Sequence, residues 1–184
     1  MICLIIKETA LEKDSLRTDN MLEKEKRTYE FLDSLGIKYE KYDHEPIMTI
    51  AAAEELDRKT GLKICKNLFL STRHSTEFYL LLMEGGKKFN TGKVSKQINV
   101  PRMTFADDEH MQEFLDITPG SVSPLGLIND KGNNVKLLID GDVLKMEKIA
   151  VHPCVNTATV IISTKDLTDK ILPSCGHGYT EVIV

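Results

Sequence analysis

The 184-residue sequence predicts a single α+β domain, with a mixed and mostly antiparallel sheet surrounded by short helices. Three observations predict this class. The length is close to that of one domain, and the composition, with 41% hydrophobic and 28% charged residues, is that of a globular protein. Short apolar runs of strand length also alternate with short amphipathic segments. This composition excludes a wholly disordered chain, a collagen and a disulfide miniprotein.

The hydrophobic runs and cysteines indicate the compartment. No run approaches the roughly 20 apolar residues that a membrane helix needs, so we expect no membrane partner. The four cysteines are scattered and form no CxxC pair, which predicts reduced thiols rather than disulfides or a zinc site. We therefore expect a cytoplasmic protein.

The first half of the chain predicts two helices, a short strand and a hairpin. Residues 21–35 carry apolar side chains at helical spacing, and residues 37–42 alternate as a short strand. Thr49 can cap a second helix. The apolar runs 64–70 and 78–83 are joined by a short polar connection, which is typical of a hairpin.

The second half predicts short helices, a loop and three more strands. Helices are expected over 91–98 and after Asp107, and Ser163 with Asp166 resembles a capping box for a last helix. The remaining segments are a loop over 118–126 and strands at 135–139, 149–151 and 157–162. We expect residues 21–172 to form the domain, with 1–20 an N-terminal appendage and 173–184 a C-terminal tail.

Positive charge gathers in one part of this acidic chain. The net charge is −4, but residues 58–106 hold ten Lys and Arg against two acids, a net charge of +8. A basic segment in an acidic protein is the electrostatic signature of a polyanionic partner. The alternative is that these side chains point in different directions on an ordinary solvated surface.

Lys66 breaks the local pattern, because it lies inside the predicted strand 64–70. Alternation places it on the same face as Leu68 and Leu70. A cation in that place must either meet an anion or extend its ammonium group to water at an edge of the sheet. Both interpretations remain open from the residues alone.

Two further features stand out in the second half. The loop Gly120-Ser121-Val122-Ser123-Pro124 can direct several backbone N–H groups at one point, which suits a carbonyl or an oxyanion, although ordinary turns share this composition. His152 lies beside Pro153 at the corner of a predicted hairpin, where it could titrate, line a pocket or be purely structural. The histidines and cysteines have no metal-ligand spacing, so no metal site and no cofactor are expected.

Three stretches together resemble a known family. They are Cys65-Lys66-Asn67-Leu68, the stretch from Pro119 to Gly126, and His152-Pro153-Cys154-Val155-Asn156-Thr157-Ala158-Thr159. In order and spacing they are similar to the YbaK/prolyl-tRNA-synthetase-associated editing domains, and most of all to freestanding Ala-tRNA(Pro) deacylases of the PrdX or ProXp-ala type. The resemblance covers about residues 21–172.

This resemblance implies a hydrolase that removes alanine from mischarged tRNA(Pro), with prolyl-tRNA synthetase as a possible partner. It implies that Lys66 holds a phosphate near the terminal adenosine and that Asn67 helps to place this nucleotide. The amides from Gly120 to Pro124 would contact the aminoacyl carbonyl, and His152 would line the amino-acid pocket and help to exclude proline. Phosphates of the acceptor stem would then meet the basic segment, with candidate contacts at Lys63, Lys87, Lys88, Lys93 and Lys96.

Other functions remain open at this point. The chain could deacylate tRNA that carries another residue, such as cysteine or serine. It could also be a non-catalytic module that binds tRNA or a synthetase, or an unrelated α+β enzyme. A hydrolase depends on the geometry of the loop at Gly120, whereas a binding module does not.

Overall fold

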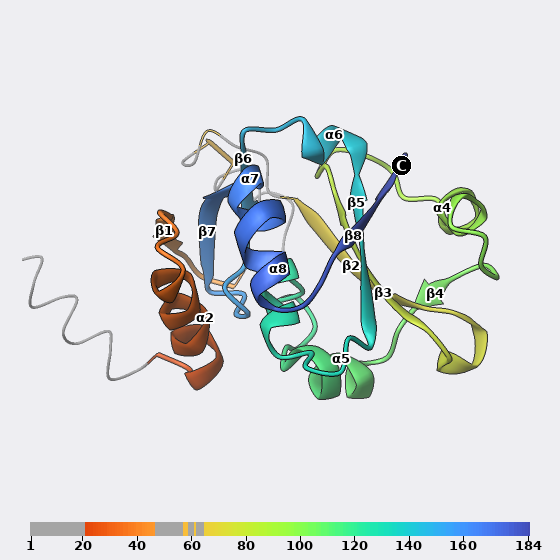
Figure 1. The fold of residues 1–184 in the computed structure, drawn as a ribbon, viewed down its shortest axis with the longest axis horizontal. Helices are drawn as coiled ribbons and strands as arrows, with labels where there is room; N and C mark the ends of the chain where they lie inside the picture. Colours follow the sequence, from red (N-terminus) through yellow and green to blue (C-terminus); the bar gives the residue numbers. More distant parts are fainter. Residues whose placement is uncertain (1–20, 47–56, 59–60, 62–64) are drawn as a thin grey trace, which may run out of the picture.

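Two β-sheets and several short helices make up the part of the chain that the computed structural model describes, which is residues 21–46, 57–58, 61 and 65–184. Figure 1 shows the five-stranded sheet on one side and the three-stranded sheet on the other. The predicted appendage 1–20 and the helix expected from Thr49 fall mostly outside the described residues.

The larger sheet has the strand order β4-β2-β3-β5-β8. Its antiparallel part pairs β2 with β3 and with β4, and its parallel part pairs β5 with β3 and with β8. The five strands, in sheet order, are Thr104–Phe105, Lys66–Ser71, Phe78–Met83, Val135–Asp140 and Tyr179–Val182. Because β4 contacts only the end of β2, the edge of β2 at Lys66 is not covered by β4.

The smaller sheet is antiparallel, with the order β1-β7-β6. Its strands are Glu40–Asp43, Ala158–Ser163 and Lys148–Val151. Helix α2 (Glu23–Ser34) lies beside this sheet (Figure 1). Its Thr28 donates a hydrogen bond to the buried sulfur of Cys154, 3.4 Å away, which ties the helix to the segment between β6 and β7.

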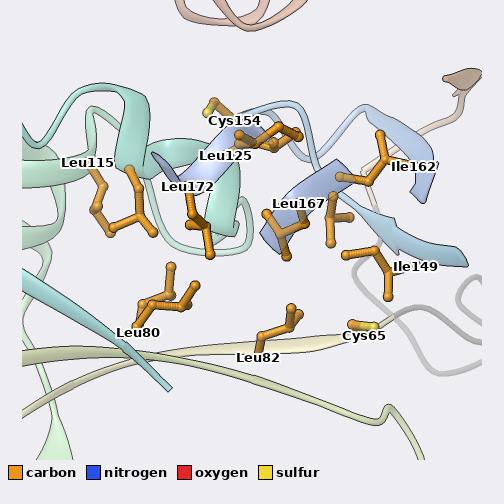
Figure 2. Close-up of a cluster of buried hydrophobic side chains, with 14 of the residues drawn as sticks. Cys65, Leu80, Leu82, Leu115, Leu125, Ile149, Cys154, Ile162, Leu167 and Leu172 are labelled. Carbon is orange, nitrogen blue, oxygen red and sulfur yellow. The ribbon is translucent and has the colours of Figure 1, made fainter. Parts of the chain in front are cut away.

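The main core lies between the two sheets. Figure 2 shows Leu80 and Leu82 of β3 facing Leu167 and Leu172, with Ile149 and Ile162 of the smaller sheet beside them. The chain after β7 supplies this layer through three short helical segments: α7 (Thr164–Asp166), the π-helical η3 (Leu167–Ile171) and α8 (Leu172–Ser174). Ser163 caps α7 by accepting a hydrogen bond from the amide of Asp166, as the sequence predicted.

A second apolar cluster covers the other face of the larger sheet. Leu70, Leu81 and Met83 pack there against Val94 of helix α4 (Thr91–Gln97). Lys66 lies on this same face by alternation, as expected. The remaining short helices are η1 (Arg73–Ser75), α5 (Asp108–Leu115), η2 (Pro124–Ile128) and α6 (Gly141–Leu144).

The predicted class of fold is confirmed, and several elements are confirmed with it. The hairpin of β2 and β3 forms, and Asp107 caps α5 by accepting from the amide of His110. Most boundaries differ by one or two residues, and two differ more: the first strand is Glu40–Asp43 rather than 37–42, and the end of the predicted loop 118–126 already belongs to η2. Short strands and 3-10 turns are set by their partners more than by local sequence, so such shifts are expected.

The last twelve residues do not form a separate tail. The sequence predicted 173–184 as a C-terminal tail, but Tyr179–Val182 pair with β5 in parallel as strand β8. Val182 is buried in the second apolar cluster. Strands that pair in parallel are distant in sequence, so no local sequence pattern predicted this pairing.

Leu82 provides a test of the core between the sheets. We expect Leu82→Ala to lower the free energy of unfolding by about 2–5 kcal/mol, because its fully buried side chain (0% exposed) would leave a cavity. Urea denaturation measures this change. Leu22→Ala, at a position 56% exposed, is the control and should change stability by less than about 0.5 kcal/mol. Equal effects of the two substitutions would contradict this description of the core.

Candidate functional site

A cavity of about 220 Å³ lies at the beginning of strand β2. Its walls come from all three stretches that the sequence analysis singled out: Cys65, Lys66, Asn67, Leu68, Gly120, Val122 and His152. These stretches are separated by more than 80 residues from the first to the last. Their convergence in one small cavity makes it the candidate site.

A hydrogen bond between the two sheets builds this cavity. The amide of Cys65, just before β2, donates to the carbonyl of Ala150 in β6, 3.3 Å away. Cys65 also lies near Ile149 in the core between the sheets (Figure 2). The contact brings the first residues of β2 next to the end of β6, and His152 follows directly at the corner before β7.

Lys66 extends its ammonium group to the surface at the rim of the cavity. The side chain is exposed, and Nζ donates a hydrogen bond to the backbone carbonyl of Lys87 at 2.9 Å. A lysine ammonium has three N–H donors, so two remain after this contact. Lys66 therefore reaches water at an open strand edge and is at the same time held by the neighbouring loop.

Asn67 points its polar atoms toward the opposite face of β2. Its Nδ2 donates to the carbonyl of Cys65 at 3.3 Å. Its Oδ1 is buried and has no hydrogen-bond partner within the described chain. A buried acceptor without a partner is costly, so this atom is suited to a donor group on a ligand.

The loop at Gly120 uses some of its amides internally and leaves others unused. Ser121 is fully engaged, since its amide and hydroxyl both donate to the carbonyl of Thr118, at 3.0 and 2.7 Å. Ser123 caps η2 by accepting from the amide of Leu125, and Pro124 has no amide hydrogen. Gly120 and Val122 line the cavity, and their amides have no hydrogen-bond partner within the described chain.

The backbone conformation of the loop requires a glycine at position 120. Gly120 has φ +87°, in the region that side chains disfavour. A Cβ atom at this position would also lie 3.5 Å from Nδ2 of Asn156, a residue of the third stretch. That distance is an ordinary contact, so the positive φ rather than a lack of space disfavours a side chain at position 120.

His152 presents a neutral imidazole at the cavity. Nδ1 lies 2.8 Å from the carbonyl of Ala158, which accepts its hydrogen and leaves Nε2 as an acceptor. Burial lowers the pKa of His152 below its ordinary value, the hydrogen bond to Ala158 opposes this shift, and nearby His44 adds to it. The ring is therefore uncharged near neutral pH.

The thiol of Cys65 is a poor nucleophile at neutral pH, although Cys65 lines the cavity. Burial raises the pKa of Cys65 to about 12. The thiolate is the nucleophilic form of cysteine, and a group with this pKa is almost wholly protonated at neutral pH. A covalent mechanism through Cys65 is therefore disfavoured, which agrees with the absence of a nucleophilic triad pattern in the sequence.

The sequence analysis missed two neighbours of the site. The ring of His44 lies 6.1 Å from that of His152, and its Nε2 is 3.0 Å from Oγ1 of Thr159. Asn156 reaches toward Gly120. Asn156 and Thr159 belong to the third stretch, but no local signal in the sequence connected His44 with His152.

The five lysines predicted to contact tRNA phosphates are not equivalent. Lys63 lies outside the described residues. Lys88, Lys93 and Lys96 are exposed and have no acidic partner in the described ranges. Lys87 differs from them: its ammonium lies 2.7 Å from Oδ2 of Asp140 and 2.6 Å from Oδ2 of Asp142, so two carboxylates compensate its charge.

Two negative findings concern the described residues. They contain no group of three or more His, Cys, Asp or Glu side chains arranged to hold a metal ion. None of their helices is both long and apolar enough to cross a membrane.

Comparisons with known proteins identify the family. Residues 44–170 match the sequence profile of the aminoacyl-tRNA editing domain. The chain therefore belongs to the aminoacyl-tRNA editing domain family, and the resemblance stated from the sequence is confirmed.

Individual relatives agree with this assignment. The chain is 32% identical over 151 residues to the prolyl-tRNA editing protein ProX of Acetoanaerobium sticklandii, covering 82% of this chain and 92% of that protein. It is 32% identical over 141 residues to a prolyl-tRNA synthetase associated domain-containing protein of Mus musculus, covering 73% and 82%. A crystal structure of a candidate trans-editing enzyme for prolyl-tRNA synthetase shares the fold, with a TM-score of 0.66, 19% identity, and coverage of 89% and 99%.

The neutral state of His152 predicts a pH dependence of stability. A histidine whose pKa is lowered by folding binds protons more readily in the unfolded chain, so its contribution is present above its ordinary pKa of 6.5 and is lost as the pH falls. We expect the free energy of unfolding, measured by urea denaturation, to decrease between pH 7.5 and about pH 5.

His152→Gln is the variant that isolates this effect, because glutamine does not titrate in this range. It should show a smaller decrease across the same pH interval than the unmodified protein. His74→Gln, at an exposed turn position, is the matched control and should keep the full decrease. The same decrease in the His152 variant as in the unmodified protein would disprove the assignment to His152.

Proposed function

We propose that this protein is a trans-editing hydrolase that deacylates mischarged Ala-tRNA(Pro). The observation that carries the proposal is the meeting of Lys66, Gly120 and His152 in one small cavity. Family membership supplies the reaction class, which is hydrolysis of an aminoacyl-tRNA ester. The names of the ProX protein and of the synthetase-associated protein support tRNA(Pro) as the substrate and prolyl-tRNA synthetase as a partner.

The chemistry requires little more than positioning. A water molecule attacks the aminoacyl carbonyl carbon and gives up a proton. The bond between this carbon and the ribose oxygen then breaks, and the ribose oxygen takes up a proton and leaves as a hydroxyl group. Because the ester is already activated, orientation of the water and stabilisation of the oxyanion can supply the rate enhancement. The unused amides of Gly120 and Val122 are donors suited to that oxyanion.

The nucleotide would occupy the rim of the cavity. In this proposal Lys66 contacts the phosphate of the terminal adenosine with its two remaining N–H groups. The buried Oδ1 of Asn67 accepts a hydrogen bond from the same nucleotide. Within the loop from Gly120 to Pro124, Gly120 and Val122 then face the carbonyl, while Ser121 and Ser123 hold the loop in shape.

Selection of alanine over proline would rest on the size of the cavity. A volume of about 220 Å³ is below the range typical of sites that enclose a drug-sized ligand, and it suits a small acyl group. His152 is placed to form its wall. Steric exclusion of a larger side chain discriminates more strongly than rejection of a smaller one, which makes refusal of proline feasible.

A second surface supports binding of RNA. Most described lysines and arginines outside the basic segment contact carboxylates, including Lys26, Arg27, Lys41, Lys136, Lys148 and Lys170. Inside the segment, six described cations have no carboxylate partner in the described chain: Lys66, Arg73, Lys88, Lys93, Lys96 and Arg102. Exposed Phe105 lines a shared hollow with Arg73 and Arg102, where its ring is available to stack with an unpaired base.

Hydrolysis of four substrates tests the proposal directly: Ala-tRNA(Pro), Pro-tRNA(Pro), Cys-tRNA(Pro) and Ala-tRNA(Ala). We expect rapid loss of the ester from Ala-tRNA(Pro) only, without added metal. Lys66→Ala should lower kcat/KM by about 30-fold, the equivalent of about 2 kcal/mol for one charge-assisted hydrogen bond. Lys165→Ala, on α7, is the control and should keep the original rate.

The alternatives give different results in the same assay. Hydrolysis of Cys-tRNA(Pro) that is faster than that of Ala-tRNA(Pro) would show that the protein removes cysteine rather than alanine from tRNA(Pro). Binding of tRNA without hydrolysis of any ester, by protein shown to be folded, would favour a regulatory binding module. If Lys66→Ala hydrolyses Ala-tRNA(Pro) as fast as the unmodified protein, the phosphate-binding role of Lys66 is refuted.

The salt dependence of tRNA affinity tests the basic surface. Each phosphate contact contributes about 0.7–0.9 to the slope of log K against log salt concentration, so Lys93→Gln/Lys96→Gln should reduce that slope by about 1.5. Filter binding with uncharged tRNA(Pro) measures it. Lys131→Gln/Lys165→Gln removes two exposed lysines outside the basic segment and should leave the slope unchanged. Equal slopes in both double variants would place the RNA elsewhere.

A further inference from the structure

Lys87 was predicted to bind phosphate, but the structure gives it two other contacts that join Lys66 to a buried acid. Its backbone carbonyl accepts the hydrogen bond from Nζ of Lys66, at 2.9 Å. Its own ammonium lies 2.9 Å from Oδ1 and 2.7 Å from Oδ2 of Asp140. A continuous chain of contacts therefore runs from Lys66 through Lys87 to Asp140.

Asp140 is the fixed end of this chain. It is the last residue of β5, its side chain is 1% exposed, and Oδ1 also faces the amide of Asp142 at the start of α6. A buried carboxylate without a cation is strongly disfavoured, so the Lys87 ammonium is held where the sheet places Asp140. Burial by itself would lower the pKa of Lys87, but the contacts with Asp140 and Asp142 outweigh it and raise the pKa.

The loop that carries Lys87 needs such an anchor. It follows β3 and contains Gly85 and Gly86, whose backbones have wide conformational freedom. Within the loop, the Lys87 amide donates to the Glu84 carbonyl at 3.2 Å, which closes a tight turn. The turn fixes the shape of the loop, while the Asp140 contact fixes its place against the sheet and hence the place of the Lys87 carbonyl.

We propose that Asp140 is a positioning residue for Lys66 and acts through Lys87. Asp140 holds the Lys87 side chain, the anchored loop presents the Lys87 carbonyl, and this carbonyl orients the Lys66 ammonium at the rim of the cavity. The catalytic consequence rests on the proposed function, in which Lys66 contacts the phosphate of the terminal adenosine. Asp140 itself touches no substrate.

A double-mutant cycle separates positioning from a purely structural role. Asp140→Asn should lower kcat/KM for Ala-tRNA(Pro) by about tenfold, mainly through KM, because the Lys66 ammonium loses its fixed orientation. In the Lys66→Ala background the same substitution should have no further effect on kcat/KM. Asp142→Asn, which removes a 49% exposed carboxylate from the same ammonium, should stay within about twofold of the original.

The outcomes are distinct. An equal loss of kcat/KM in the original and Lys66→Ala backgrounds would overturn the proposal, because Asp140 would then act independently of Lys66. If Asp140→Asn does not fold, the double variant Lys87→Met/Asp140→Asn replaces it, because it removes both charges and leaves no unpaired buried ion. Its kcat/KM is then compared with and without Lys66→Ala in the same way.

A readout that needs no deacylation separates this proposal from the function. The NMR signal of the Lys66 side chain, assigned by its loss in Lys66→Ala, should move in Asp140→Asn and stay in place in Asp142→Asn. Titration with adenosine 5′-monophosphate should shift it less in the Asp140 variant. A moved signal in a protein without deacylase activity would keep the positioning role and reject the function, whereas an unmoved signal would reject the positioning role.

Discussion

The site depends on one backbone hydrogen bond, from the amide of Cys65 to the carbonyl of Ala150. The two sheets bury their facing apolar sides against each other, and this contact fixes how they meet at the start of β2. It brings Lys66 and Asn67 within reach of the corner that holds His152. A backbone hydrogen bond between buried segments is costly to break, so it holds the cavity walls against the tightly packed core.

The chemistry of the cavity follows from what burial does to its titratable groups. The Cys65 thiol is protonated and the His152 ring is neutral, so neither brings a charge into the cavity. Gly120 and Val122 line it, and their amides have no hydrogen-bond partner within the described chain. Such an environment favours stabilisation of charge that develops during a reaction over attack by a protein nucleophile.

Charge is arranged differently around the site than elsewhere. On the rest of the described surface most cations are compensated by nearby acids, whereas the cations near the rim and on α4 are left uncompensated. Lys87 is the exception within this region, because two carboxylates neutralise it. Two neighbouring residues of the same loop therefore differ in role: Lys87 is anchored by carboxylates, whereas Lys88 is exposed and contributes to the positive surface.

The sequence by itself determined the α+β class, the β2–β3 hairpin, the caps at Asp107 and Ser163, and the three stretches that form the site. These features depend on local periodicity, on capping chemistry or on motifs that a family shares. Only the tertiary structure decided that residues 179–182 join the sheet, that His44 lies near His152, and that Lys87 faces Asp140. Each of these contacts joins residues far apart in the chain, and no pattern within a segment specifies which distant partner it will meet.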